Sequence, residues 1–318
     1  MGEKVKIVEV GPRDGLQNEA KTLSVEDRAE LIQKLIATGE KFLEGGSFVS
    51  PKAIPQMVDS EKVLEKISGS VLGSAATSAS VDLSFLVPNE KGLERALEAK
   101  VKSIAIFTAT SDSFTEKNIG MKVADSLKVF ESVAKKAIQE KLRLRGYVST
   151  AFGCPYEGSQ KAEKVLEVTE KLLAMGCDEV SIGDTIGVAH PKQIEKVFSL
   201  LARKLGSQNF PHRIAGHFHD TRGMALLNIK TSLDLGLRTF DSSIGGLGGC
   251  PYAKGSSGNV ATEEVVWSLE GLGFSTGISV EKLLEVAAWI ESKIGRPLKS
   301  RLYLSRPLSG PNALYFES

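Results

Sequence analysis

The sequence is short of several features, and each shortage narrows its class. Its 318 residues include only three cysteines, too few for a disulfide framework, so a reducing compartment is expected. The net charge of +1 gives no argument for nucleic-acid or membrane-surface binding. No apolar run approaches the roughly 18 residues that span a bilayer. Strand-like sequence starts at Val5, leaving no room for a signal or transit peptide. We expect a cytoplasmic protein without nucleic-acid or membrane partners.

Short apolar runs alternate instead with amphipathic segments along almost the whole chain. Several runs are β-branched and lack polar alternation, as buried parallel strands do. Between them apolar residues recur at helical spacing, as in Ile194–Leu205, and Gly39 and Gly236 fall where helices should end. The expected strands are Lys6–Val10, Lys41–Glu44, Leu83–Val87, Ser103–Thr108, Leu144–Ser149, Glu179–Gly183, Ile214–His219 and Thr239–Ile244.

Eight strand–helix units over about 275 residues predict an α/β fold, the (β/α)8 TIM barrel. A doubly wound open sheet is the alternative, but the turn Gly11–Gly15 after the first strand is not the expected G-x-G-x-x-G. A further helix, Val280–Ile294, and a Pro/Gly/Ser-containing tail follow. We therefore predict one catalytic domain over 1–318, with the barrel at about 5–275 and the extra helix and tail at 279–318.

Catalytic side chains of such a barrel lie at the C-terminal ends of its strands. Polar residues do fall there in this sequence. The ends of strands one, two, six and seven carry Arg13, Asp14, Glu44, Asp184, His217 and His219. The eighth strand runs into a glycine-rich stretch that contains Cys250 and ends at Asn259. Because glycine orders at a high entropic cost, we expect this stretch to be an active-site lid.

The pair His217 and His219 is the sharpest local signal, because the chain has only four histidines. Spacing of two residues on a strand points both rings to one face. They suit a divalent metal, with Asp14 and Asn259 available to complete the coordination. Two nitrogens and two oxygens favour Mg²⁺ or Mn²⁺, with Zn²⁺ as a further option. The alternative is a hydrogen-bonded histidine pair that only fills the top of the barrel.

Arg13 stays charged at any working pH and could stabilise an enolate oxygen at the barrel mouth. The alternative interpretation is that Arg13 only forms a surface ion pair with Asp14 or Glu19. Glu44 and Asp184 have two interpretations as well: they either cap helices or orient Arg13, or they transfer protons directly.

Other reactive or charged residues receive simpler interpretations. Cys154, at the end of the fifth strand, competes with Cys250 as the functional thiol, whereas Cys177 is expected to be a small buried apolar residue. His190 and His212 lie in connections and are given no role. The basic cluster Lys141–Arg145 is expected on a solvated helix surface.

Taken in order, these segments resemble the 3-hydroxy-3-methylglutaryl-CoA lyase family. Its members are metal-dependent (β/α)8 enzymes that act through enolates. The resemblance covers almost the whole chain, from about Val5 to about Gly295. Its motifs are Val8–Glu19, Ser47–Pro51, Arg145–Ser149, Gly153–Gly158, Gly183–Gly187, His217–Asp220 and Gly246–Tyr252. The last motif is the most specific, because the wider superfamily shares the Arg-Asp and H-x-H features but not this cysteine loop.

The resemblance implies retro-Claisen cleavage of 3-hydroxy-3-methylglutaryl-CoA to acetyl-CoA and acetoacetate, the chemistry of leucine degradation. An acyl-CoA substrate, a divalent cation (Mg²⁺ or Mn²⁺) and a homodimer are therefore expected. The implied metal ligands are Asp14, His217, His219 and Asn259. The base that takes the hydroxyl proton is either His217 or Asp184.

The resemblance also implies roles for residues around the metal. Arg13 would stabilise the thioester enolate, and Cys250 would carry a proton on the lid. Glu263 would support the site, and Glu44 and Asp184 match positions tied to substrate placement and proton transfer. The expected substrate contacts are Arg13, Gln17, Ser47 and, in a loop after the fourth strand, Asn118.

Two departures from the family pattern, Gly45-Gly46 and Arg222, could alter acyl-group or CoA contacts. Three alternatives remain at this point. An aldolase or Claisen-type synthase of the same superfamily needs no Cys250 loop, and such a synthase would be expected to carry further domains. A biotin-dependent carboxyltransferase would be expected to have a lysine in the metal site, beside the histidines. A non-catalytic binding barrel would be expected to lack one or more of the site residues.

Overall fold

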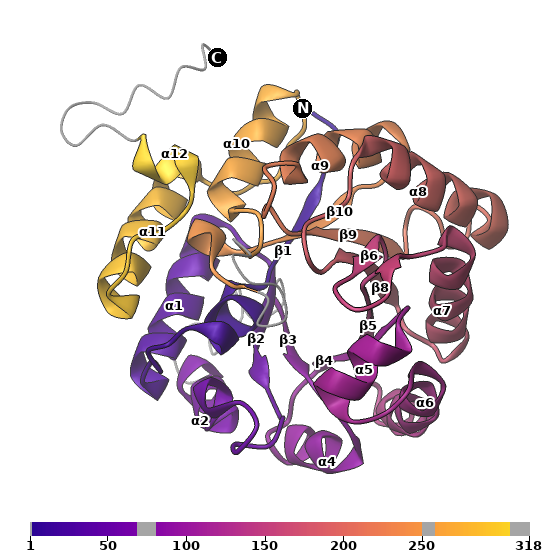
Figure 1. Ribbon diagram of the computed structural model, residues 1–318. Helices are drawn as coiled ribbons and strands as arrows, with labels where there is room; N and C mark the ends of the chain where they lie inside the picture. Colours follow the sequence, from indigo (N-terminus) through magenta and orange to yellow (C-terminus); the bar gives the residue numbers. More distant parts are fainter. Residues whose placement is uncertain (1, 69–80, 250–257, 306–318) are drawn as a thin grey trace.

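The computed structural model describes residues 2–68, 81–249 and 258–305. Within these ranges eight parallel strands close into a barrel in the order β1-β10-β9-β8-β5-β4-β3-β2 (Figure 1). A short antiparallel hairpin, β6–β7, follows β5. The strands are β1 (Lys6–Glu9), β2 (Phe42–Ser47), β3 (Asp82–Leu86), β4 (Ser103–Ala109), β5 (Arg143–Ser149), β6 (Gly153–Cys154), β7 (Gly158–Ser159), β8 (Glu179–Asp184), β9 (Ile214–Phe218) and β10 (Thr239–Ser242). The TIM barrel prediction is confirmed, because β1 pairs with both β10 and β2 and leaves no open edge.

Helices surround the barrel, and α11 lies beside α1 (Figure 1). They are α1 (Val25–Thr38), α2 (Ser60–Ser68), α4 (Glu90–Glu98), α5 (Asp112–Ile119), α6 (Val123–Gln139), α7 (Ala162–Ala174), α8 (Pro191–Leu205), α9 (Ala225–Asp234), α10 (Thr262–Gly271), α11 (Val280–Ile294) and α12 (Arg301–Leu304). The predicted extra helix is α11, whereas the short α12 was not predicted. Among the described helices, none has both the length and the apolar character needed to cross a membrane.

The helix boundaries follow from capping and packing. Ser24 accepts a hydrogen bond from the Asp27 N–H at the start of α1, which satisfies one of the free amides there. Gly39 ends α1 at φ +111°, and a Cβ at this position would lie 2.3 Å from the carbonyl oxygen of Gly277. Only glycine therefore fits. The apolar face of α8 is buried as predicted, apart from the half-buried Leu205 at its end.

The second strand is longer than predicted and contains both glycines that depart from the family pattern. It continues beyond Glu44 to Ser47, with a bulge between Glu44 and Gly46. A Cβ on Gly45 would lie 2.8 Å from Leu83, and a Cβ on Gly46 would lie 2.7 Å from the Ser60 hydroxyl. A larger residue at either position would therefore have to displace the Leu83 or Ser60 side chain that packs against it.

Candidate active site

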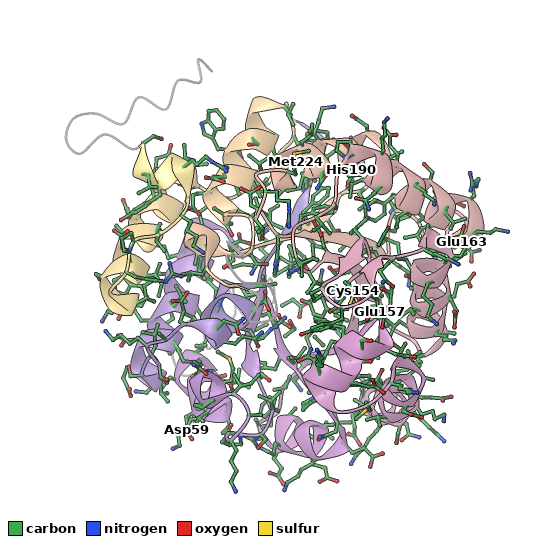
Figure 2. The ribbon with its side chains drawn as sticks, viewed as in Figure 1. Asp59, Cys154, Glu157, Glu163, His190 and Met224 are labelled. Carbon is green, nitrogen blue, oxygen red and sulfur yellow. The ribbon has the colours of Figure 1, made fainter. Side chains whose placement is uncertain are left out.

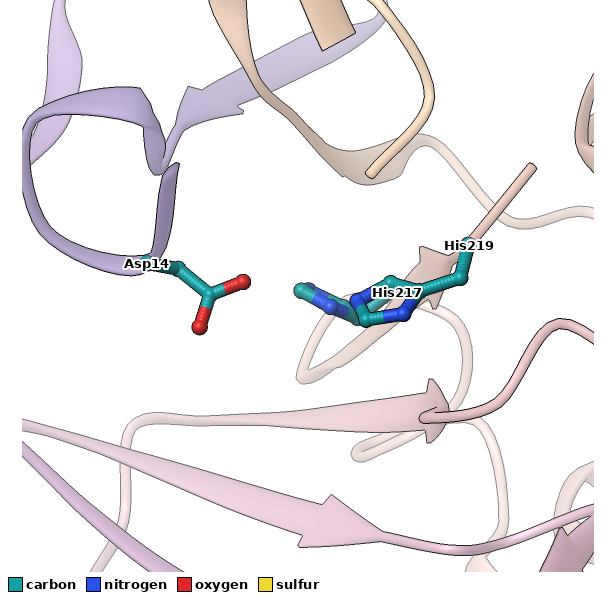
Figure 3. Close-up of side chains that lie close together, drawn as sticks. All are labelled: Asp14, His217 and His219. Carbon is teal, nitrogen blue, oxygen red and sulfur yellow. The ribbon is translucent and has the colours of Figure 1, made fainter. Parts of the chain in front are cut away.

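Three side chains of the types that bind metals meet at the C-terminal end of the barrel. Asp14 lies in a π-helical turn, Gly11–Gly15, directly after β1. His217 is in β9 and His219 directly follows it. One potential ligand atom from each residue lies within 4.8 Å of those from the other two. Figure 3 shows the Asp14 carboxylate facing both imidazole rings.

The turn that carries Asp14 is fixed by buried contacts. The Gly11 N–H donates to Glu9 Oε1 (2.7 Å), and Pro12 presets the backbone at the start of the turn. A Cβ on Gly15 would lie 2.7 Å from Ser243 Oγ, so the turn presses directly on the loop after β10. The sequence Gly-Pro-Arg-Asp-Gly thus forms a rigid corner that presents Asp14 at the barrel mouth.

The two histidines differ in their surroundings. His217 Nδ1 lies 3.1 Å from Asp241 Oδ2, so its other nitrogen, Nε2, is the atom left for an ion. Burial lowers the pKa of His217, but the Asp241 hydrogen bond and the nearby carboxylates outweigh it and raise the pKa. Burial and the neighbouring His217 lower the pKa of His219 to about 4, which keeps this ring neutral at neutral pH. Its Nδ1 is buried without a hydrogen-bond partner among the described residues, as a metal ligand would be in the absence of its ion.

Asp14 is ionised and sits among polar side chains. Burial raises its pKa, but Arg13 and the two imidazoles outweigh it and hold the pKa below the ordinary value. Asn259 Nδ2 donates to Asp14 Oδ2 (2.8 Å), and Gln17 Nε2 donates to Asp14 Oδ1 (3.2 Å). The structure therefore brings both predicted residues, Asn259 and Gln17, to the carboxylate that faces the histidines.

Arg13 is not the surface ion pair of the alternative interpretation. Its side chain is buried, with Nε donating to Glu44 Oε2 (2.6 Å) and Nη1 donating to Asp14 Oδ1 (2.8 Å). Burial lowers the pKa of the guanidinium, but the negative charges of Glu44 and Asp14 outweigh this effect. The net result is a raised pKa, so the guanidinium stays protonated. Glu19 pairs instead with Arg296. Glu44 thus orients Arg13 directly, one of the two roles considered for it.

Two further buried carboxyls lie at the ends of strands or the start of a helix. Asp184 accepts hydrogen bonds from the Val188 and Ala189 amides (2.9 Å each), and burial raises its pKa to about 6. Glu263, in the first turn of α10, accepts from the Gly245 amide (3.0 Å) and so holds the loop after β10. Burial raises its pKa to about 7. Both groups are therefore much weaker acids than exposed carboxyls.

Other predicted residues are not joined to this cluster by hydrogen bonds that the structure shows. Ser47 is buried at the end of β2, where its hydroxyl accepts from a nearby backbone amide. The prediction that Asn118 lies in a loop was wrong, because helix α5 extends through it. Cys154 lies in the β6–β7 hairpin beside α5 rather than in β5, and its Sγ is 3.0 Å from Ser111 Oγ (Figure 2). Cys250 lies outside the described residues.

Residues inside the barrel were misread or missed from the sequence. Arg145 lies in β5, within the predicted strand Leu144–Ser149, but the prediction that its basic cluster is solvated was wrong for this residue, which is 3% exposed. Its Nη2 donates to Asp241 Oδ1 (2.6 Å), and its Nη1 donates to the Tyr147 hydroxyl (2.6 Å). The available signal was the two-residue spacing of Arg143, Arg145 and Tyr147, which places polar side chains on one face of an otherwise apolar strand.

Comparison with known proteins places this site in a family. The HMGL-like family model matches residues 4–290. The hydroxymethylglutaryl-CoA lyase of Bacillus subtilis is 46% identical, over 94% of this chain and 96% of that protein. A 3-hydroxy-3-isohexenylglutaryl-CoA/hydroxymethylglutaryl-CoA lyase of Pseudomonas aeruginosa is 44% identical, over 94% and 96% of the two chains. The chain belongs to the hydroxymethylglutaryl-CoA lyase family.

Membership of this family makes the protein a carbon–carbon lyase. A solved relative is similar over nearly its whole length. This HMG-CoA lyase from Acinetobacter baumannii, in complex with coenzyme A and 3-methylmalate, has a TM-score of 0.88 and 33% identity, covering 97% of each chain. The family assignment therefore agrees with the barrel and with the metal-type cluster at its mouth.

Proposed function

We propose that the protein cleaves 3-hydroxy-3-methylglutaryl-CoA to acetyl-CoA and acetoacetate by a retro-Claisen reaction. The observation that carries the proposal is the meeting of Asp14, His217 and His219 beside the buried Arg13, at the barrel end where TIM-barrel enzymes act. Relatives more than 40% identical over nearly the whole chain are named for this reaction. An acyl-CoA substrate follows from the same proposal.

A divalent cation would be held by Asp14, His217, His219 and Asn259. The donors suit Mg²⁺ or Mn²⁺, because two imidazole nitrogens are combined with carboxylate and amide oxygens. The orphaned Nδ1 of His219 supports the assignment. Asn259 now points its amide nitrogen at Asp14, and a half-turn of the amide would present its oxygen instead. The ion would polarise the substrate oxygens and lower the pKa of the tertiary hydroxyl.

Arg13 is assigned to the negative charge that develops on the thioester oxygen. A guanidinium has five N–H donors, and the contacts with Glu44 and Asp14 occupy three of them. Two N–H groups remain for an enolate oxygen. Because Glu44 and Asp14 fix the plane of the guanidinium before the substrate arrives, these donors need no reorganisation as the charge forms.

The hydroxyl proton is assigned to Asp184. The two candidates were His217 and Asp184, but His217 has its Nδ1 on Asp241 and would use Nε2 for the ion. No lone pair would then remain on His217 to take a proton. A carboxyl with a pKa of about 6 is a stronger base than an ordinary aspartate and is ionised at neutral pH.

The electrons and protons then balance without a redox cofactor. As Asp184 removes the hydroxyl proton, the C–C bond breaks, a ketone forms on the acetoacetate fragment and the bonding pair becomes the acetyl-CoA enolate. Protonation of the enolate carbon is assigned to Cys250, on the basis of the family resemblance. Glu44 positions Arg13, and Glu263 supports the loop that leads toward Cys250.

The test is acetyl-CoA release from 3-hydroxy-3-methylglutaryl-CoA, measured with added Mg²⁺ or Mn²⁺ and with a chelator. We expect turnover that requires the metal and is lost in Cys250→Ala. Metal-independent turnover, or full activity of Cys250→Ala, would refute the mechanism. The relative that also carries the isohexenyl name supports a second candidate substrate, 3-hydroxy-3-isohexenylglutaryl-CoA. Turnover of that thioester alone would replace the first substrate assignment.

The assembly state and location remain predictions. A homodimer, expected from the resemblance, would be tested by light scattering of the purified protein. A cytoplasmic location, expected from the scarcity of cysteine, would be tested by fractionation of the source cells.

A further inference from the structure

A line of buried charged groups runs through the barrel interior beneath the three metal-type residues. Its centre is Arg145 of β5, which donates to Asp241 of β10 through two nitrogens (2.6 and 3.2 Å) and to Glu179 of β8 through Nε (2.8 Å). Lys6 of β1 pairs with the same glutamate. Arg145, Asp241 and Glu179 all lie nearly or completely out of solvent. A bidentate arginine–carboxylate pair of this kind fixes the carboxylate in position and orientation.

Asp241 receives a hydrogen bond from every side. Arg145 occupies both carboxylate oxygens, and the Ser181 hydroxyl donates to Oδ2 (2.8 Å). The fourth contact is His217 Nδ1, at 3.1 Å from the same Oδ2. An ionised carboxylate only accepts hydrogen bonds, so Nδ1 of a neutral His217 must carry the ring proton. The lone pair of His217 is then on Nε2, the nitrogen not engaged by Asp241.

We infer that Asp241, anchored by Arg145, is a positioning residue for metal binding: it fixes the tautomer and ring orientation of His217 so that Nε2 can hold the ion. The inference rests on the metal site proposed above but not on the identity of the substrate. It also gives the charged barrel interior a function, because Arg145 and Ser181 keep the Asp241 carboxylate from turning away from the imidazole.

The variant Asp241→Asn tests the inference with little change in shape. Only the oxygen of an asparagine amide can accept a hydrogen bond, whereas both oxygens of the aspartate accept. The asparagine therefore loses the hydrogen bond from either Arg145 or His217. If the NH₂ end faces His217, the ring proton is forced onto Nε2 and blocks the lone pair. Mn²⁺ binding would be measured by calorimetry on chelator-treated protein without substrate. We expect the Mn²⁺ dissociation constant to rise by about 10- to 100-fold.

Glu179→Gln is the matched control. Glu179 is as deeply buried as Asp241 and pairs with the same guanidinium, but it has no hydrogen bond to His217. We expect this variant to lose thermal stability, as Asp241→Asn does, while its Mn²⁺ dissociation constant stays within about twofold of the wild-type value. Equal weakening of Mn²⁺ binding in both variants, or wild-type binding by Asp241→Asn, would overturn the inference.

A second measurement needs no variant of Asp241. Nitrogen-15 NMR of the metal-free wild-type protein, labelled at its four histidines, reports the tautomer of each neutral ring. The inference predicts a proton on Nδ1 of His217 at alkaline pH, and a proton on Nε2 would overturn it. Failure of the wild-type protein to bind Mn²⁺ would remove the proposed metal site itself. Failure to cleave 3-hydroxy-3-methylglutaryl-CoA would affect only the proposed substrate.

Discussion

Replacement of Arg13 by lysine separates its charge from its geometry. Lysine keeps the positive charge but has one nitrogen, so it cannot hold both Glu44 and Asp14 and still offer two N–H groups to an enolate oxygen. Loss of one such donor lowers kcat by about 10²- to 10³-fold, or about 2.7–4 kcal/mol of transition-state stabilisation. Lysine weakens the buried ion pair with Glu44 but does not remove it. Deleting one partner of a buried ion pair costs about 3–5 kcal/mol of folding stability, and the loss in Arg13→Lys should be smaller than that.

The assay is steady-state acetyl-CoA release, together with urea unfolding of the same preparations. We expect Arg13→Lys to lower kcat by about 100-fold or more with little change in KM, because the contact forms as charge develops. Arg28→Lys is the matched control, since Arg28 is equally buried but donates to Val58 O and Ser60 Oγ behind β2. It should lose stability and keep its kcat. A kcat for Arg13→Lys within about threefold of wild type, or an equal loss in Arg28→Lys, would contradict the role assigned to Arg13.

Two further predictions concern pH. With Asp184 as the base, kcat should rise with pH through about 6. The variant Asp184→Asn should lose this pH dependence, and its kcat should fall by about 10²- to 10⁴-fold. A variant with the pH profile of the wild type would count against the assignment. Glu263 binds its proton more tightly when folded, so its stabilisation is present below its ordinary pKa and is lost as pH rises through about 7. Between about pH 5 and about pH 8, the free energy of unfolding of the wild type should fall by up to about 3 kcal/mol relative to that of Glu263→Gln. A difference between the two proteins that stays constant with pH in urea unfolding would contradict this prediction.

The barrel and the meeting of its metal-type side chains at one rim could be predicted because both depend on local sequence. Buried parallel strands appear as short apolar runs, and the polar residues directly after them must meet at one rim once the barrel closes. Asp14 and His219 were found in this way, although they are far apart in the chain. The two-residue spacing of His217 and His219 fixed their common face independently of the rest of the fold.

The interior network could not be predicted in the same way. Arg145 and Asp241 are separated by 96 positions, and their pairing depends on how strands that are not neighbours face one another across the barrel. Basic residues are mostly exposed, which is why the cluster Lys141–Arg145 was assigned to a solvated surface. The bulge at Gly45 was missed for a related reason, since it depends on the neighbouring strand and on Ser60 behind it.

The most direct test of the metal assignment is electron–nuclear double resonance of Mn²⁺ bound to protein with nitrogen-15 histidine. We expect couplings to two imidazole nitrogens, from His217 and His219, and the loss of one of them in His219→Gln. No histidine coupling, or two couplings that persist in His219→Gln, would contradict the metal assignment.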